Sequence, residues 1–122
     1  ARIEANLRRE RRAQYLNAEQ KRSRLFFGKL GLDLKERTLA IDGRPIPLTR
    51  REYDIIELLA VHSGQVFSRE QIYEKVWGYD AEGDSSTVVE HVKKIRAKFA
   101  AVDPETEYIA TIWGIGYRWN KK

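Results

Sequence analysis

Residues 85–99, SSTVVEHVKKIRAKF, carry the most informative structural pattern of this chain. Their pattern predicts a single helix with two faces of different character. Apolar side chains recur at every third or fourth position, as along one buried helical stripe; they are Val88, Val92, Ile95 and Phe99. A neighbouring stripe is polar and contains Thr87, His91, Lys94 and Lys98. One face is therefore expected to pack against a core, and the other is left for an anionic partner.

The basic face of this helix indicates a surface for DNA. The helix opens with small polar residues that can cap its first turn, and it then presents Lys93, Lys94, Arg96 and Lys98. A basic helix of this size fits the major groove. For the helix taken alone, a solvated charged face is the simpler interpretation, so the DNA hypothesis depends on the segments around it.

The following segment, residues 108–119 (YIATIWGIGYRW), predicts a β-hairpin. Its strands, at 108–112 and 117–119, would meet at a tight turn containing Gly114 and Gly116. A helix-turn-helix followed by such a hairpin is a winged helix, whose hairpin can reach the DNA backbone or the minor groove. The apolar residues of the hairpin can also close the core, and we expect both roles in one element.

The residues before the helix predict a small antiparallel sheet at 25–48. Apolar residues alternate there on both sides of a turn at Asp42 and Gly43, a residue pair typical of tight hairpins. Pro45 fits an edge strand, because proline donates no backbone hydrogen bond. This sheet is expected to be scaffold.

Two further helices share one local signal at their starts. Thr49 is followed three residues later by a Glu, and Ser68 by a Gln, which is the capping-box pattern. The helices are expected to end near Gly64 and Gly78, with a short strand at 65–67 between them. The chain is therefore expected to be an α+β winged helix-turn-helix domain, with an N-terminal antiparallel β-sheet, three helices and a C-terminal β-hairpin wing.

The composition argues against several classes of function. The 122 residues can bury one core of ordinary size, and they include no cysteine. The two histidines, His62 and His91, are far apart, so no zinc site is expected. No phosphate-binding glycine loop and no nucleophile with a base is found, so we expect no enzyme activity and no cofactor. Without a long apolar run or signal peptide, the protein is expected to be cytoplasmic, with no membrane partner.

Charge is segregated along the chain. The formal net charge is +5, and residues 1–24 account for it, with eight Lys and Arg against three Glu, so the remaining residues carry fifteen charges of each sign. Acidic residues lie before the basic helix, at 78–84, and after it, at 103–107. The local field of the helix, and not the net charge, therefore supports a nucleic-acid interface.

Residues 1–24 favour a helix by composition but carry only a fragment of an apolar stripe, at Ile3 and Leu7. They could form an exposed basic helix or linker, or a non-specific contact to phosphates. A piece of a preceding domain is the interpretation that we favour.

The Asp42–Gly43 hairpin is followed, in this order, by the segments LTRREYDIIELL, VFSREQIYEKVWG, TVVEHVKKIRAKF and TIWGIGYRW. With these segments in this order, the chain resembles the OmpR/PhoB-type winged-helix effector domain of bacterial two-component response regulators. The resemblance covers residues 25–122, which would be the DNA-binding domain. Residues 1–24 are similar to the end of a receiver-domain helix followed by an interdomain linker. The WGIGY wing is similar to that of the vancomycin-resistance-regulator branch.

The resemblance implies a sequence-specific transcription regulator, with the helix 85–99 in the major groove and the hairpin 108–119 as the wing. It implies a homodimer on tandem direct-repeat half-sites of double-stranded DNA, and contact with RNA polymerase. It also implies a histidine kinase that acts through a receiver domain outside this sequence.

The resemblance, together with the polar helical stripe, assigns roles to single residues. Base contacts are expected from Lys94 and Val89. Contacts to the DNA backbone are expected from Trp77, Thr87, His91, Lys93, Arg96 and Lys98. Wing contacts are expected from Thr111, Trp113 and Arg118. The loop expected to face RNA polymerase contains Tyr79, Asp80, Glu82 and Asp84. For Trp77, a role in the core is the alternative that we weight more heavily.

Two residues depart from the family pattern. Val89 stands where relatives often have an Asp, which removes an acceptor for a cytosine amino group and changes base preference. Trp113 stands where many relatives carry an Arg that enters the minor groove, so electrostatic recognition of groove width is not expected from it.

A winged-helix module that docks on an acidic protein is the alternative function. Segregated positive charge fits that partner as well as DNA. RNA fits less well, because an exposed helix has no access to the deep A-form groove.

Overall fold

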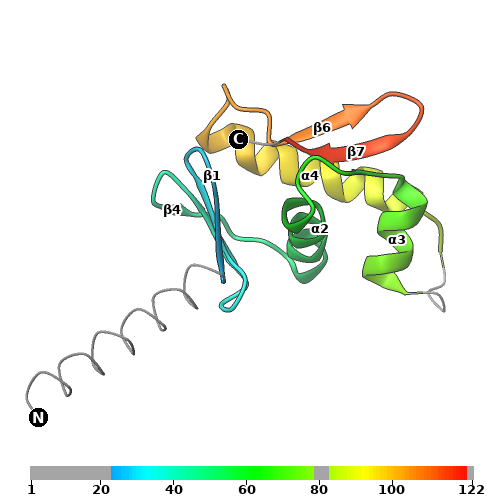
Figure 1. Ribbon diagram of the computed structural model, residues 1–122, viewed down its shortest axis with the longest axis horizontal. Coiled ribbons are helices and arrows are strands. Elements are labelled where there is room, and N and C mark those ends of the chain that lie inside the picture. The colour runs from blue at the N-terminus through cyan, green and yellow to red at the C-terminus, as the bar shows by residue number, and fades with distance from the viewer. Residues whose placement is uncertain (1–22, 79–82, 121–122) are drawn as a thin grey trace, which may run out of the picture.

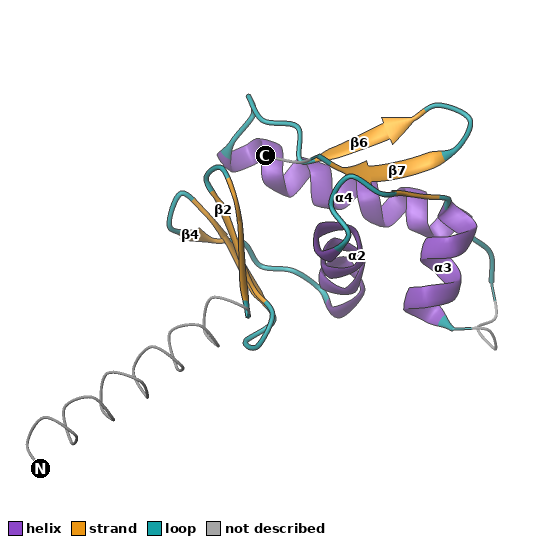
Figure 2. Ribbon diagram, viewed as in Figure 1, coloured by secondary structure: helices purple, strands orange, loops and turns teal. Residues whose placement is uncertain are grey.

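The computed structural model describes residues 23–78 and 83–120. Their elements form the expected α+β winged helix (Figures 1 and 2). In chain order they are β1 (Arg24–Phe27), β2 (Leu30–Asp33), β3 (Thr38–Ile41), β4 (Arg44–Pro45), α2 (Arg50–Val61), β5 (Val66–Phe67), α3 (Arg69–Trp77), α4 (Ser86–Val102), β6 (Ile109–Ile112) and β7 (Gly116–Trp119). Residues 1–22 of the expected helix lie outside the described residues; Ser23 lies in a turn, and Arg24 begins β1.

The N-terminal strands form an antiparallel sheet in the order β1-β2-β3-β4, as predicted. Asp42 and Gly43 join β3 to β4 with φ angles of 53° and 78°, the left-handed conformation that this residue pair tolerates. Pro45 lies on the edge strand β4. One face of the sheet is buried in the core through Leu30, Leu32, Leu39 and Ile41.

The two capping boxes are confirmed. Thr49 accepts a hydrogen bond from the Glu52 backbone N–H while the Glu52 side chain accepts one from Thr49, and Ser68 and Gln71 repeat this at the start of α3. Helix α3 ends at Gly78, whose φ of 97° suits a glycine. Local sequence signals thus determine where both helices begin.

Helix α4 is the central element of the core. Its predicted apolar stripe is buried, with at most 4% of any of these side chains exposed: Val88, Val92, Ile95 and Phe99. Figure 1 shows α2 and α3 against one side of α4 and the β6–β7 hairpin alongside it. Trp119 of β7 is fully buried, and its ring meets the Phe27 ring edge-on at 5.3 Å. The C-terminal strand therefore ties the first sheet to the helices.

The hairpin differs from the prediction at Gly116. We expected this residue in the turn, but it is the first residue of β7, in a sheet of order β5-β7-β6. A Cβ atom on Gly116 would lie 2.0 Å from the Phe67 carbonyl oxygen, so β5 could not pair this closely with any other residue there. Gly114 does lie in the turn, with a φ of 78°. Gly114 is therefore required by the turn, and Gly116 is required by the close spacing of β5 and β7.

Candidate nucleic-acid interface

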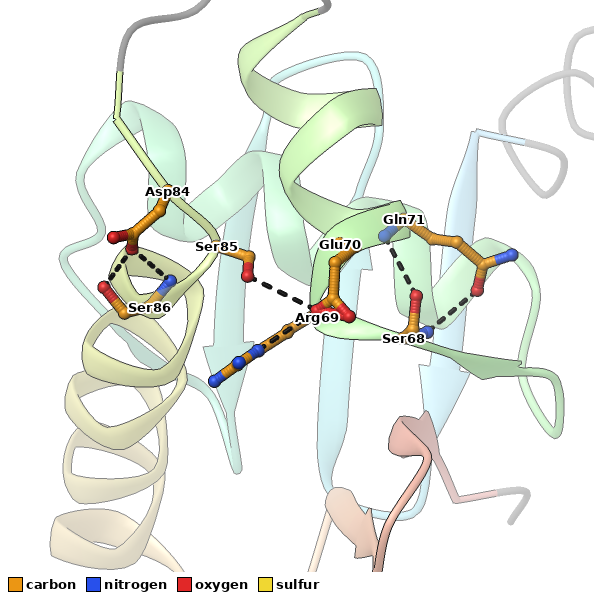
Figure 3. Close-up of polar contacts among 7 residues, drawn as sticks. All are labelled: Ser68, Arg69, Glu70, Gln71, Asp84, Ser85 and Ser86. Atoms are coloured by element: carbon orange, nitrogen blue, oxygen red, sulfur yellow. Dashed lines mark hydrogen bonds and ion pairs between the residues drawn. The ribbon is translucent and has the colours of Figure 1, made fainter.

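The start of α4 is held by side chains to which the sequence pattern did not assign this role (Figure 3). We expected small polar residues to cap the helix, but the Ser85 side chain makes no capping hydrogen bond. Instead Asp84 accepts hydrogen bonds from the Ser86 backbone N–H, at 2.8 Å, and from the Ser86 hydroxyl. These two bonds lower the pKa of Asp84. Ser85 donates to Glu70 at 3.3 Å, which joins the starts of α3 and α4.

An acidic residue just before a helical run was the available signal for this cap. Asp84 belongs to the loop expected to face RNA polymerase, and the structure gives it a role in the helix start. The other members of that group, Tyr79, Asp80 and Glu82, lie outside the described residues.

Two lysines of α4 are free to meet a ligand. Lys93 and Lys94 are exposed, and neither has a hydrogen bond or ion pair within the described residues. Thr87 and Val89 are half-buried on the first turns of the same helix. The basic face predicted from the sequence therefore has its unpaired charge in the middle of α4.

His91 and Trp77 form one aromatic contact between α4 and α3. The His91 ring meets the Trp77 ring edge-on at 5.1 Å, and His91 Nδ1 lies 2.8 Å from the Thr87 carbonyl oxygen. Because a carbonyl oxygen only accepts, Nδ1 is the donor in this contact.

Trp77 is half-buried against the core, which confirms its predicted packing role. It stacks on Tyr73 at 5.3 Å, and the Arg51 guanidinium lies 5.2 Å from its ring centre. Arg51 also donates to the Val76 carbonyl oxygen at 2.7 Å. These contacts fix the end of α3 against α2, close to His91 on α4.

The charged ends of Arg96 and Lys98 are bound within the domain. Lys98 donates to Glu52 at 2.6 Å and to the Pro47 carbonyl oxygen at 2.9 Å. Arg96 donates to the Ile109 carbonyl oxygen at 3.0 Å and to the Thr111 hydroxyl at 2.7 Å. Both residues were expected to contact the DNA backbone, and their observed partners give them structural roles.

Glu52, the partner of Lys98, is almost entirely buried, with 2% of the residue exposed. Burial alone would raise its pKa, but hydrogen bonds from Lys98 and from the Thr49 backbone N–H outweigh it, so the pKa lies below the ordinary value. Glu52 thus remains ionised between the cap of α2 and the middle of α4. The sequence pattern identified the capping role of Glu52 and gave no signal for its ion pair with Lys98.

We expect acid to destabilise the domain. Four described carboxyl groups have a lowered pKa: Asp33, Glu52, Asp84 and Asp103. Such a group stabilises the folded state above its ordinary pKa, and this contribution is lost as the pH falls through the folded-state pKa. Urea unfolding followed by circular dichroism measures the urea concentration at which half of the protein is unfolded. This midpoint should stay constant down to about pH 5 and decrease below about pH 4. A midpoint at about pH 3 equal to that at neutral pH would contradict this expectation.

The wing carries two exposed apolar side chains at its turn. Trp113 is 89% exposed and Ile115 is 61% exposed, and Gly114 lies between them. Thr111 on β6 and Arg118 on β7 are half-buried. The Thr111 hydroxyl accepts a hydrogen bond from Arg96. The Arg118 guanidinium lies 3.5 Å from the Asn120 side-chain oxygen. The sequence pattern singled out Trp113 and overlooked Ile115.

Two features are not found in the described part of the chain. Residues 23–78 and 83–120 contain no group of three or more His, Cys, Asp or Glu side chains that could hold a metal ion. Within the same ranges, no helix has both the length and the apolar character needed to span a bilayer.

A winged helix whose longest helix buries one face and exposes lysines on another has the form of a DNA-binding domain. Residues 43–119 match the family model described as "Transcriptional regulatory protein, C terminal", and this chain belongs to that family, the OmpR/PhoB-type DNA-binding domains of response regulators. It is a family of transcription regulators and not a class of enzymes.

Relatives are similar over most of this chain. The transcriptional regulatory protein ResD of Bacillus subtilis is 37% identical over 119 residues, which cover 96% of this chain and 50% of ResD. SpaR of Bacillus subtilis is 40% identical over 98% of this chain and 50% of its own length. VanRB of Enterococcus faecalis is 43% identical over 75% of this chain and 39% of VanRB. The chain spans about half the length of the first two relatives.

Solved structures show the same fold. The response regulator DrrB of Thermotoga maritima, an OmpR/PhoB homologue, matches with a TM-score of 0.72 and 31% identity over 80% of this chain and 44% of DrrB. The DNA-binding domain of Klebsiella pneumoniae RstA, in complex with the RstA box, matches with a TM-score of 0.69 and 25% identity over 80% of this chain and 96% of that one.

Proposed function

We propose that this domain binds duplex DNA sequence-specifically, with α4 in the major groove and the β6–β7 hairpin as the wing. The proposal depends on one observation. Lys93 and Lys94 are exposed and have no hydrogen bond or ion pair among the described residues, on a helix whose opposite face is buried. A helix anchored in this way can present side chains to base edges without moving.

The proposed contacts fall into three sets. Lys94 and Val89 face bases. Lys93, Thr87, His91 and Trp77 face the DNA backbone. Thr111, Trp113 and Arg118 belong to the wing. Arg96 and Lys98 act from inside the domain, because Arg96 holds the wing and Lys98 holds α2.

One round of selection from a random duplex library, at near-physiological salt, tests the proposal. We expect enrichment of two similar half-sites in tandem, about one helical turn apart. Binding without enrichment, lost as salt rises, would leave only attraction to phosphates and would overturn sequence-specific recognition.

Lys94→Ala is expected to cost about 1–3 kcal/mol of binding free energy on the selected duplex and little on random duplex, because base contacts carry the discrimination. Lys93→Ala should weaken binding to both duplexes. It should also reduce the salt slope, the steepness with which the logarithm of the binding constant falls with the logarithm of salt concentration, by about one, as the loss of a phosphate contact does. Fluorescence anisotropy across a salt series measures both effects.

These lysines make a matched pair, since both are exposed on the same helix and neither has a partner among the described residues. An equal loss from Lys94→Ala on selected and random duplex would remove Lys94 from the base-contacting set.

The remaining proposals concern the whole protein. We propose a cytoplasmic, non-enzymatic regulator that binds tandem half-sites as a homodimer and contacts RNA polymerase through the loop after α3. A histidine kinase would act on it through a receiver domain. The family, and the similarity to regulators about twice as long as this chain, support these proposals.

A further inference from the structure

Apolar surface is concentrated at the end of the wing. Among the described residues, four large hydrophobic side chains are exposed: Phe26, Val61, Trp113 and Ile115. Two of these four flank Gly114, and we call residues 113–115 the wing tip. Figure 1 shows the loop that joins β6 to β7 projecting from the body of the domain. Exposing a tryptophan in this way forgoes the free energy of burying a large apolar surface.

The wing tip is held in one conformation. The Ile115 backbone N–H donates to the Ile112 carbonyl oxygen at 2.9 Å, and Gly114 between them has a φ of 78°. This hydrogen bond closes a tight turn. The side chains on either side of Gly114 therefore project from a defined point and not from a long loop.

The strands behind the wing tip are also fixed. Arg96 of α4 donates to Ile109 and Thr111 of β6, and its guanidinium lies 5.4 Å from the centre of the Tyr117 ring on β7. One α4 side chain therefore contacts both strands of the hairpin. The apolar tip is preorganised relative to the helix that carries Lys94.

The hairpin itself can meet an anionic duplex, because residues 108–120 contain no Asp or Glu and Arg118 provides a positive charge on the returning strand. Glu105 and Glu107 line the same groove as Trp113. An apolar point of this shape can enter a groove and contact sugars and base edges, as the wedge residues of other minor-groove proteins do. Such a contact adds no charge, so it releases no counterions.

We propose that Trp113 and Ile115 form an apolar wedge that this domain inserts into the minor groove beside the half-site bound by α4. The wing thereby recognises how easily a base step opens, and it favours flexible pyrimidine–purine steps over a stiff A-tract. This inference rests on the proposed DNA-binding function and specifies how the wing contributes to it.

The test compares Trp113→Ala and Trp113→Arg with the unchanged 122-residue chain. The probes are the selected duplex, a random duplex of equal length, and two versions of the selected duplex with a TA step or an A-tract at the wing position. We expect Trp113→Ala to weaken binding about tenfold with an unchanged salt slope. Trp113→Arg should raise the slope by about one and lose the preference for the TA step.

Thermal unfolding provides the control for stability. Because Trp113 is 89% exposed, both variants should unfold at the temperature of the unchanged chain. Ile115→Ala should weaken binding in the same salt-independent way but by less, because its apolar surface is smaller.

Three outcomes would overturn the wedge. The first is equal affinity of Trp113→Ala and the unchanged chain for every duplex. The second is a loss of affinity that is accompanied by a lower salt slope, and the third is protection of Trp113 from acrylamide quenching that grows with protein concentration in the absence of DNA. The last would identify a contact between copies of the chain. Failure of the unchanged chain to distinguish selected from random duplex would instead overturn the proposed function.

Discussion

Lys98→Ala is expected to lower the free energy of unfolding by about 3 kcal/mol, because it leaves the buried Glu52 carboxylate without its cationic partner. Glu52 is 2% exposed, and its oxygen lies 2.6 Å from the Lys98 ammonium. Only Glu52 is buried in this pair, since the Lys98 side chain is 34% exposed and the Glu52 side chain 3% exposed. Removing Lys98 leaves a carboxylate that is poorly solvated and has no cationic partner. Urea unfolding at neutral pH measures the effect.

Lys93→Ala is the matched control on the same helix, and it should change stability by no more than about 0.5 kcal/mol. Glu52→Gln keeps an oxygen for the Thr49 backbone N–H but removes the charge. In that background, Lys98→Ala should cost clearly less than it does alone. Equal costs in the two backgrounds would show that the stabilisation by Lys98 does not depend on the charge of Glu52.

A change in the DNA-binding salt slope gives a second comparison. If Lys98→Ala lowers the slope by about one while the domain remains folded, Lys98 reaches a phosphate despite its internal partners. An unchanged slope agrees with the structural role that its contacts to Glu52 and Pro47 indicate.

Gly116→Ala is expected to destabilise the domain by about 3 kcal/mol, because the added Cβ atom overpacks a backbone contact. That atom would lie 2.0 Å from the Phe67 carbonyl oxygen and 2.7 Å from Ser68 Cα. Backbone atoms cannot rotate away, so β5 would have to separate from β7. Because Ser68 caps α3, the shift would also disturb the orientation of that helix. Urea unfolding followed by far-ultraviolet circular dichroism measures the loss.

Gly114→Ala is the control, because Gly114 has a φ of 78° but nothing within 4 Å of an added Cβ atom. Its cost should be about 1 kcal/mol, from left-handed backbone strain alone. If the two alanine variants lost equal stability, strand spacing at Gly116 would not be the reason for the glycine.

Much of the fold could be predicted because its signals are local. The capping boxes at Thr49 and Ser68 determine two helix starts through contacts three residues apart, and the Asp42–Gly43 turn closes a hairpin through its own backbone preference. The candidate interface was less predictable. Sequence spacing placed Lys94 and Lys98 on one helical stripe, but it could not show that only one of them is free.

The buried face and the basic face of α4 follow from the order of its residues, because a helical period of 3.6 residues sorts side chains by position alone. Which of its cations can meet a ligand depends instead on tertiary packing. Lys98 finds Glu52, 46 residues earlier, and Arg96 finds Thr111, 15 residues later. Such pairings depend on how distant segments pack, and no local period encodes them. Packing likewise left Trp113 at the end of the wing and buried Trp119, six residues away, in the core.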